Sequence, residues 1–139
     1  MDRGEQDAAT ANLSEIKVSK LALERGTSKQ VKELAQQMIT DHTKAGDQLR
    51  QISQQQGFTL PTEPTAKQKA DYDQLAKLNG AAFDEAFLKQ MKADHDTAVS
   101  LFQRGSTEIQ DPQLRQFATK TLPTLQHHQQ MVQHDMKQM

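Results

Sequence analysis

The chain has 139 residues with a formal net charge of −1, and it contains no cysteine. Its length fits a single domain with its own core, and the missing cysteine excludes disulfides, thiolate metal ligands and cysteine nucleophiles. Basic and acidic residues are interspersed and aromatic residues make up only 4%, so no surface for nucleic acid is expected. No apolar run approaches the roughly 20 residues that a transmembrane helix needs.

The first half of the chain predicts two helices joined by a short turn. Residues 1–7 are polar, and we expect them to be disordered. The first helix should cover residues 8–25 and end at Gly26, because glycine commonly terminates helices. The second should begin after Thr27 or Ser28, both suitable N-caps, and continue to about residue 56.

The second half predicts two more helices after a loop at residues 57–65 that contains two prolines. The third helix should cover residues 66–104 and end at Gly105, with Asn79-Gly80 as the point where it can break in two. The fourth should begin at Asp111-Pro112, an N-cap followed by proline at the first helical position. It should reach about residue 137, with a kink at Pro123.

Nothing in the sequence competes with a helical fold. Alternating β-branched residues, the pattern of strands, are missing, while Ala, Gln, Lys, Glu and Leu dominate. The segments therefore predict one all-α domain over residues 1–139. Two helical hairpins joined by the longer loop correspond to an up-down-up-down four-helix bundle.

Two twelve-residue stretches, 38–49 and 91–102, resemble each other without a gap, and each places a histidine in an apolar row. The row through His42 is spaced for one helix face and is otherwise apolar, and the row through His95 has the same property. The fourth helix presents His128 in a third such row, and the first helix offers Glu15. At a rise of about 1.5 Å per residue these four side chains can share one layer. The matched pairs of the repeat are Met38/Met91, Asp41/Asp94, His42/His95, Ala45/Ala98 and Leu49/Phe102.

Three inward histidines and a carboxylate indicate a metal site inside the bundle. Imidazole is a common ligand of zinc, copper and iron, and three nitrogens with the Glu15 oxygen would complete the tetrahedron that zinc prefers. The sequence therefore favours a divalent transition metal, zinc first, with copper or iron as alternatives. Asp41 and Asp94 lie about 100° around their helices from the histidines, where they could accept a ring N–H. The ligands of this prediction are His42, His95, His128 and Glu15.

Other interpretations of the same residues stay open at this point. The histidines could form a polar packing layer without metal. No Glu-x-x-His or Asp-x-x-His occurs, so a di-iron carboxylate centre is not expected. If a metal binds, its affinity should fall below about pH 6 as the imidazoles protonate.

The last helix suggests a second site. His127, Met131 and His134 share a helix face, and imidazole with thioether suits copper. The alternative is a solvated helix end whose Met131 packs on a neighbouring helix.

Four segments resemble a bacterial family, domain of unknown function 4142: LSEIKVSKLAL (13–23), MITDH (38–42), GAAFDEAFLKQMKADH (80–95) and TLPTLQHH (121–128). The resemblance implies a ferritin-like four-helix bundle in the periplasm or at the outer membrane, exported by a signal that this chain lacks. The family itself implies no settled activity. From the histidines and Glu15 the sequence predicts metal handling or envelope stress protection rather than turnover, with a metal-free structural or protein-interaction module as the alternative. A protein partner and homo-oligomerisation stay open. Carried over by position, the family's site residues are Glu15, Asp41, His42, Asp94, His95 and His128.

Overall fold

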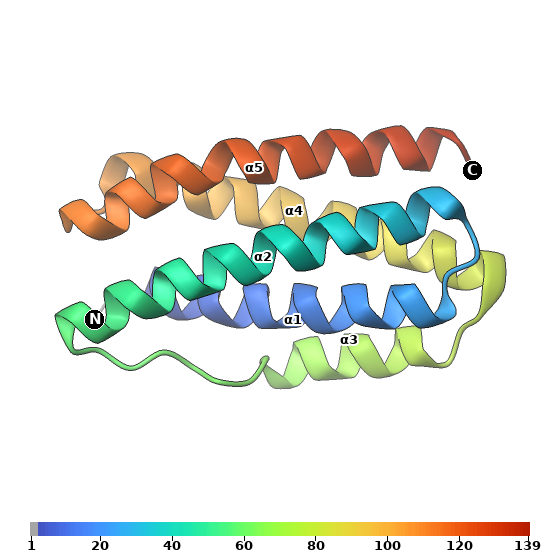
Figure 1. Ribbon diagram of the computed structural model, residues 1–139, viewed down its shortest axis with the longest axis horizontal. Helices are drawn as coiled ribbons and strands as arrows, with labels where there is room; N and C mark the ends of the chain where they lie inside the picture. Colours follow the sequence, from blue (N-terminus) through green and yellow to red (C-terminus); the bar gives the residue numbers. More distant parts are fainter. Residues whose placement is uncertain (1–2) are drawn as a thin grey trace.

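The computed structural model describes residues 3–139 and builds them from five α-helices (Figure 1). Among these residues there is no strand, so the predicted all-α fold is confirmed. None of the helices in this part of the chain combines the length and apolar character needed to cross a bilayer. The helices are α1 (Arg3–Arg25), α2 (Lys29–Gln56), α3 (Ala66–Ala76), α4 (Gly80–Glu108) and α5 (Pro112–Lys137).

Four long helices form the bundle and the short α3 lies outside it. Contacts run around the bundle in the order α1, α2, α5, α4 and back to α1, whereas α3 packs on α1 and α4. Each long helix is antiparallel to both of its neighbours, so α2 and α4 are parallel and stand on one diagonal (Figure 1). A bundle with one long crossover between two antiparallel pairs is the ferritin-like arrangement.

The predicted up-down-up-down order of the four long helices is wrong, because α3 returns along the outside of the bundle. The chain breaks at Asn79-Gly80, and Gly80 takes a positive φ of 61° at the start of α4. Consequently α4 starts at the same end as α2. The Asp84 carboxylate of α4 accepts hydrogen bonds from the backbone N–H groups of Thr27 (3.1 Å) and Ser28 (2.9 Å) in the α1–α2 turn. The long helices therefore run up-down-down-up.

Most predicted helix ends are confirmed. The Ser28 hydroxyl caps α2 by accepting from the Val31 N–H, and the Asp111 carboxylate caps α5 by accepting from the Leu114 N–H. Gly57 ends α2 as expected. Pro123 lies inside α5, and the kink there stays a prediction.

Two predicted boundaries are wrong. Residues 3–7 are helical rather than disordered, because α1 continues to the end of the bundle, where Ala9 packs with Leu49 and Leu114. Residues 1–2 of that prediction lie outside the described residues. Gly105 does not end a helix but lies buried within α4. A Cβ atom there would come within 3.2 Å of the Ala118 Cβ, so this glycine allows α4 and α5 to approach closely.

Candidate metal centre

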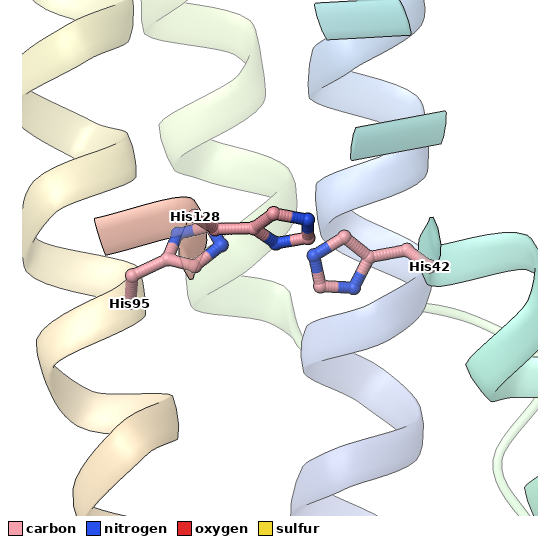
Figure 2. Close-up of side chains that lie close together, drawn as sticks. All are labelled: His42, His95 and His128. Atoms are coloured by element: carbon pink, nitrogen blue, oxygen red, sulfur yellow. The ribbon is translucent and has the colours of Figure 1, made fainter. Parts of the chain in front are cut away.

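His42, His95 and His128 meet in the middle of the bundle (Figure 2). They come from α2, α4 and α5, and their ring centroids lie 5.3–5.7 Å apart. His42 is fourteen residues beyond the α2 cap Ser28, and His95 is sixteen beyond the α4 cap Asn79. Because α2 and α4 are parallel and start at the same end, these two histidines reach the same height. The prediction that the three histidines face inward in one layer is therefore confirmed.

One nitrogen of each imidazole is hydrogen-bonded to an oxygen atom. All three partners are acceptors (an amide oxygen, a backbone carbonyl and a carboxylate), so the bonded ring nitrogen carries the proton and donates. The bonds run from His42 Nδ1 to Asn12 Oδ1 (2.7 Å), from His95 Nδ1 to the Met91 carbonyl (2.9 Å) and from His128 Nε2 to Asp41 Oδ2 (2.7 Å).

The second nitrogen of each imidazole has no hydrogen-bond partner and is buried. These atoms are His42 Nε2, His95 Nε2 and His128 Nδ1. In the tautomers set by the bonded nitrogens, each of the three keeps a free lone pair. One ligand atom from each histidine lies within 4.8 Å of the others. Three lone pairs directed into one buried space are the arrangement that a metal ion needs from imidazole ligands.

Burial keeps the three imidazoles neutral. It lowers the pKa of His42 well below 6.5, with the charges of His95 and His128 adding to the effect. It lowers the pKa of His95 to about 4. It also lowers the pKa of His128, although the Asp41 carboxylate opposes that shift. Neutral imidazole is the form that binds metal, so protons compete less than the sequence alone suggests, and we expect the affinity to hold below pH 6.

Asn12 of α1 is a site residue that the sequence analysis missed. Its amide oxygen accepts from the His42 ring, and its amide nitrogen donates to the His42 carbonyl at 2.6 Å. Gly46 makes room for it, since a Cβ at position 46 would lie 2.6 Å from the Asn12 Nδ2. The sequence offered only weak indications of this contact. Asn12 precedes Glu15 by three residues, and a glycine, Gly46, lies inside α2 one turn after His42.

The two aspartates of the repeat differ in what they do. Asp41 accepts a ring N–H as predicted, but from His128 on a different helix rather than from its neighbour His42. Asp94 instead contacts Glu15. The three ring hydrogen bonds go to other residues, so the predicted role of Asp94 as an acceptor for a ring N–H is not seen.

Glu15 is buried beside the histidines, but its oxygens do not join them. Its side chain is 4% exposed and lines a small cavity that the three histidines also line. The ligand atoms that lie close to one another, however, come only from the three histidines. Burial, and then the charge of Asp94, raise the pKa of Glu15 well above 4.5. The Glu15 side chain is hydrogen-bonded to Asp94, whose own pKa is also raised by burial. A raised pKa makes the ionised carboxylate, the form that binds metal, more costly for Glu15 than for an exposed glutamate.

The predicted second site at the end of α5 is not assembled by the described residues. His127 and His134 are exposed. Met131 packs against the main core, the larger of the two apolar clusters inside the bundle, instead of lying free beside the two histidines. This matches the alternative that the sequence left open, and copper binding there stays a prediction.

The family follows from a comparison with sequence profiles. The profile of DUF4142, a domain of unknown function, matches residues 4–134. The chain belongs to the DUF4142 family. The resemblance stated from the four sequence segments is thereby confirmed. No curated protein sequence matches this DUF4142 chain.

Three solved structures share the fold at low sequence identity. A DUF305 fragment from Deinococcus radiodurans has a TM-score of 0.85 at 16% identity, covering 99% of this chain and 95% of that one. A DUF305 protein from Streptomyces coelicolor, described as secreted, has a TM-score of 0.78 at 11% identity, covering 93% and 86%. CopM in its Cu(I)-bound form has a TM-score of 0.77 at 17% identity, covering 96% of both chains. At these identities the likeness establishes the fold.

Proposed function

We propose that this protein binds one Cu(I) ion in the bundle core through His42 Nε2, His95 Nε2 and His128 Nδ1. The observation that carries the proposal is the convergence of these three buried nitrogens, each without a hydrogen-bond partner. Their opposite ring nitrogens are held by Asn12, Asp41 and a backbone carbonyl. Such partners fix the tautomer and the orientation of metal-binding histidines.

A polar packing layer without metal accounts less well for this geometry. Side chains retained for packing specificity are expected to satisfy one another, because each unsatisfied buried polar atom costs roughly 1–3 kcal/mol. Here the histidines do not bond to each other, although their ring centroids lie within 5.7 Å. All three tautomers present an acceptor to the centre and none presents a donor. A bound cation supplies what this arrangement lacks.

The donor set favours Cu(I) over the zinc that the sequence put first. Zinc sites are almost always four-coordinate, and the predicted fourth ligand, Glu15, is bonded to Asp94 and has a raised pKa that disfavours its ionised form, so zinc would need a water molecule as its fourth ligand. Cu(I) accepts three ligands, and its single charge costs less to bury among neutral imidazoles than a double charge does. The Cu(I)-bound state of CopM, a protein of the same fold, supports this choice. Zinc is the second candidate.

The proposed role is copper handling in the cell envelope or outside the cell. A relative in fold is described as secreted, and the family resemblance implies export. The proposal is reversible holding of the ion, either as storage or as protection of the envelope against copper stress.

The test is metal binding by protein purified without an affinity tag. Under anaerobic conditions, competition with bicinchoninate should give one tightly bound Cu(I) per chain. The variants His42→Ala, His95→Ala and His128→Ala should each weaken binding by more than about 100-fold, since each removes a ligand. His127→Ala and His134→Ala, at exposed positions on the same helix as His128, are the matched variants: they should keep the tightly bound Cu(I) of the core, and loss of a second, weaker Cu(I) in them would reveal the site predicted at the end of α5. Unchanged affinity in the first three variants would overturn the proposal, and tighter binding of Zn²⁺ than Cu(I) would replace copper with zinc.

A further inference from the structure

The two sides of the histidine layer are packed differently. Toward the α1–α2 turn the next residues are Met38, Met91 and Val132, all fully buried in the main core. Toward the opposite end there is a cavity of about 40 Å³ that the three histidines themselves line. A volume of this size holds an ion or a few water molecules. The histidines therefore separate a dense half of the bundle from a hollow one.

The hollow half is built by the sequence repeat. Ala45 and Ala98, each one turn beyond its histidine, both line the cavity. On the dense side the matched pair is Met38 and Met91. Because α2 and α4 are parallel and stand on one diagonal (Figure 1), the repeat places a large residue twice on one side of the histidines and a small residue twice on the other.

A second cavity lies next to the first, toward the end of the bundle. Its volume is about 280 Å³, and it reaches the first turn of α1 and the last turn of α4. Ala8, Leu49, Phe102 and Phe117 line both cavities. The rings of Phe102 and Phe117 lie 5.9 Å apart at 54°, so this aromatic pair stands where the two spaces meet. The carboxylates of Asp7 and Glu108 line the outer cavity at exposed positions.

We propose that the metal ion reaches and leaves the three histidines along the bundle axis through these two cavities, with the Phe102–Phe117 pair restricting its passage. The inference rests on the proposed function and adds the route to it. Arg104 also lines the outer cavity, but the carboxylates of Asp7 and Glu108 outnumber it among the exposed charges there, so the opening still attracts a cation. The alanines of the inner cavity leave room for its passage and offer no ligand that would hold it before the histidines do.

A lateral route is the alternative that the experiment must separate. The His42 side chain is 7% exposed, and the side chain of Asp41 is 23% exposed. An ion could therefore arrive from the side of the bundle near α2. Substitutions in the axial cavities would leave such a route unchanged.

The experiment measures the rate at which excess bathocuproine disulfonate removes Cu(I) from the loaded protein, together with the equilibrium Kd. Ala98→Leu fills part of the inner cavity without removing a ligand. It should slow the removal of Cu(I) roughly tenfold, as about 1.4 kcal/mol of added barrier would. Because Kd should stay unchanged, the loading of Cu(I) should slow by the same factor. Phe102→Ala should accelerate removal instead. Ala86→Leu is the matched control, since Ala86 is a half-buried alanine of α4 that packs against the main core.

The outcomes distinguish the route from the site. Failure of the wild type to bind Cu(I) removes both proposals. Tight binding with unchanged removal rates in Ala98→Leu, Ala98→Val and Phe102→Ala overturns the axial route and leaves the site standing. The smaller Ala98→Val keeps the test usable if leucine at that position prevents folding. A change of Kd without a change of removal rate also contradicts the route, because a barrier affects both directions equally.

Discussion

At the scale of single residues, the two nitrogens of each imidazole lie in different environments. One is bonded to a fixed oxygen acceptor, and the other is left with its lone pair in the centre. The acceptors come from α1, α2 and the backbone of α4, so three helices orient the ligands. The carboxylate of Asp41 is the only side chain among them that brings a negative charge to the ring it holds, and that charge makes His128 a better donor to a cation.

Replacing Asp41 with asparagine should therefore weaken Cu(I) binding without removing a ligand. The amide is nearly isosteric but uncharged, and it can present a donor where His128 Nε2 needs an acceptor. Loss of such a partner typically costs about 10–100-fold in metal affinity. The measurement is competition with bicinchoninate at neutral pH.

Asp96→Asn is the control for this substitution. Asp96 directly follows His95, but its carboxylate is exposed and bonds to Lys92 and Gln129. This variant should bind Cu(I) as the wild type does. If both variants lose affinity equally, the effect of Asp41 arises from general electrostatics and not from its bond to His128.

The same imidazoles should make the metal-free protein lose stability as the pH falls from about 6.5 to about 5. In the unfolded chain the three histidines protonate around pH 6.5, whereas in the folded chain burial holds their pKa values lower, that of His95 at about 4. The unfolded state thus binds more protons in this window, and stability rises with pH by up to about 1.4 kcal/mol per unit per histidine.

Glu15 and Asp94 oppose this trend, because their raised pKa values let the folded state retain protons that the unfolded state releases. Asp135, whose pKa burial also raises, acts in the same direction as these two carboxyls. The histidine contribution is therefore measured as a difference: urea unfolding of the apoprotein between pH 5 and pH 7 should show a smaller rise of stability with pH in His42→Leu than in the wild type. An identical pH dependence in the two proteins would contradict the lowered pKa of His42.

At the scale of helices, neighbouring residues in the sequence were sufficient to predict where the helices end but not the direction in which each long helix runs. Ser28, Asp111 and Gly57 act within one turn of themselves, so their capping roles could be read from neighbouring residues. The reversal at Asn79-Gly80 could not be separated from a bend in one helix, because it depends on α3 packing on the outside of α1. The helix start at Arg3 was missed since polar residues there are ordered by a distant contact of Ala9.

For the candidate site, too, the sequence predicted what depends on neighbouring residues and missed what depends on contacts between helices. A helical period of apolar residues placed His42, His95 and His128 inside the bundle, and the structure brings them together. Their partners were not predictable in detail, because Asp41 turns to a histidine of α5 and Asn12 reaches across from α1. The raised pKa of Glu15 follows from its burial and its contact with Asp94, neither of which a sequence pattern reports.

At the scale of the whole molecule, the histidine layer interrupts the core. The larger apolar cluster lies on one side of it, and the smaller cluster around Leu49 and Leu114 lines the cavities on the other. Filling the layer with apolar side chains would join the two. A protein selected for stability alone would have no reason to keep three unsatisfied nitrogens and a hollow at this position, and the balance between stability and binding can be measured.

Replacing all three histidines with leucine should therefore stabilise the metal-free protein. Leucine has a similar volume, and the change removes three buried nitrogens without partners. It also breaks the ring bonds to Asn12 and Asp41, but both residues are half-buried, so their freed oxygens can bond to water. We therefore expect unfolding to cost about 2 kcal/mol more at neutral pH. Cu(I) at about 100 times its Kd should stabilise the wild type by about 2.7 kcal/mol and leave the leucine variant unchanged. Urea unfolding with and without Cu(I) makes the comparison. A triple variant less stable than the apoprotein would mean that the histidines serve the fold itself, whereas a stabler variant that ignores Cu(I) would mean that the bundle gives up stability to hold the ion.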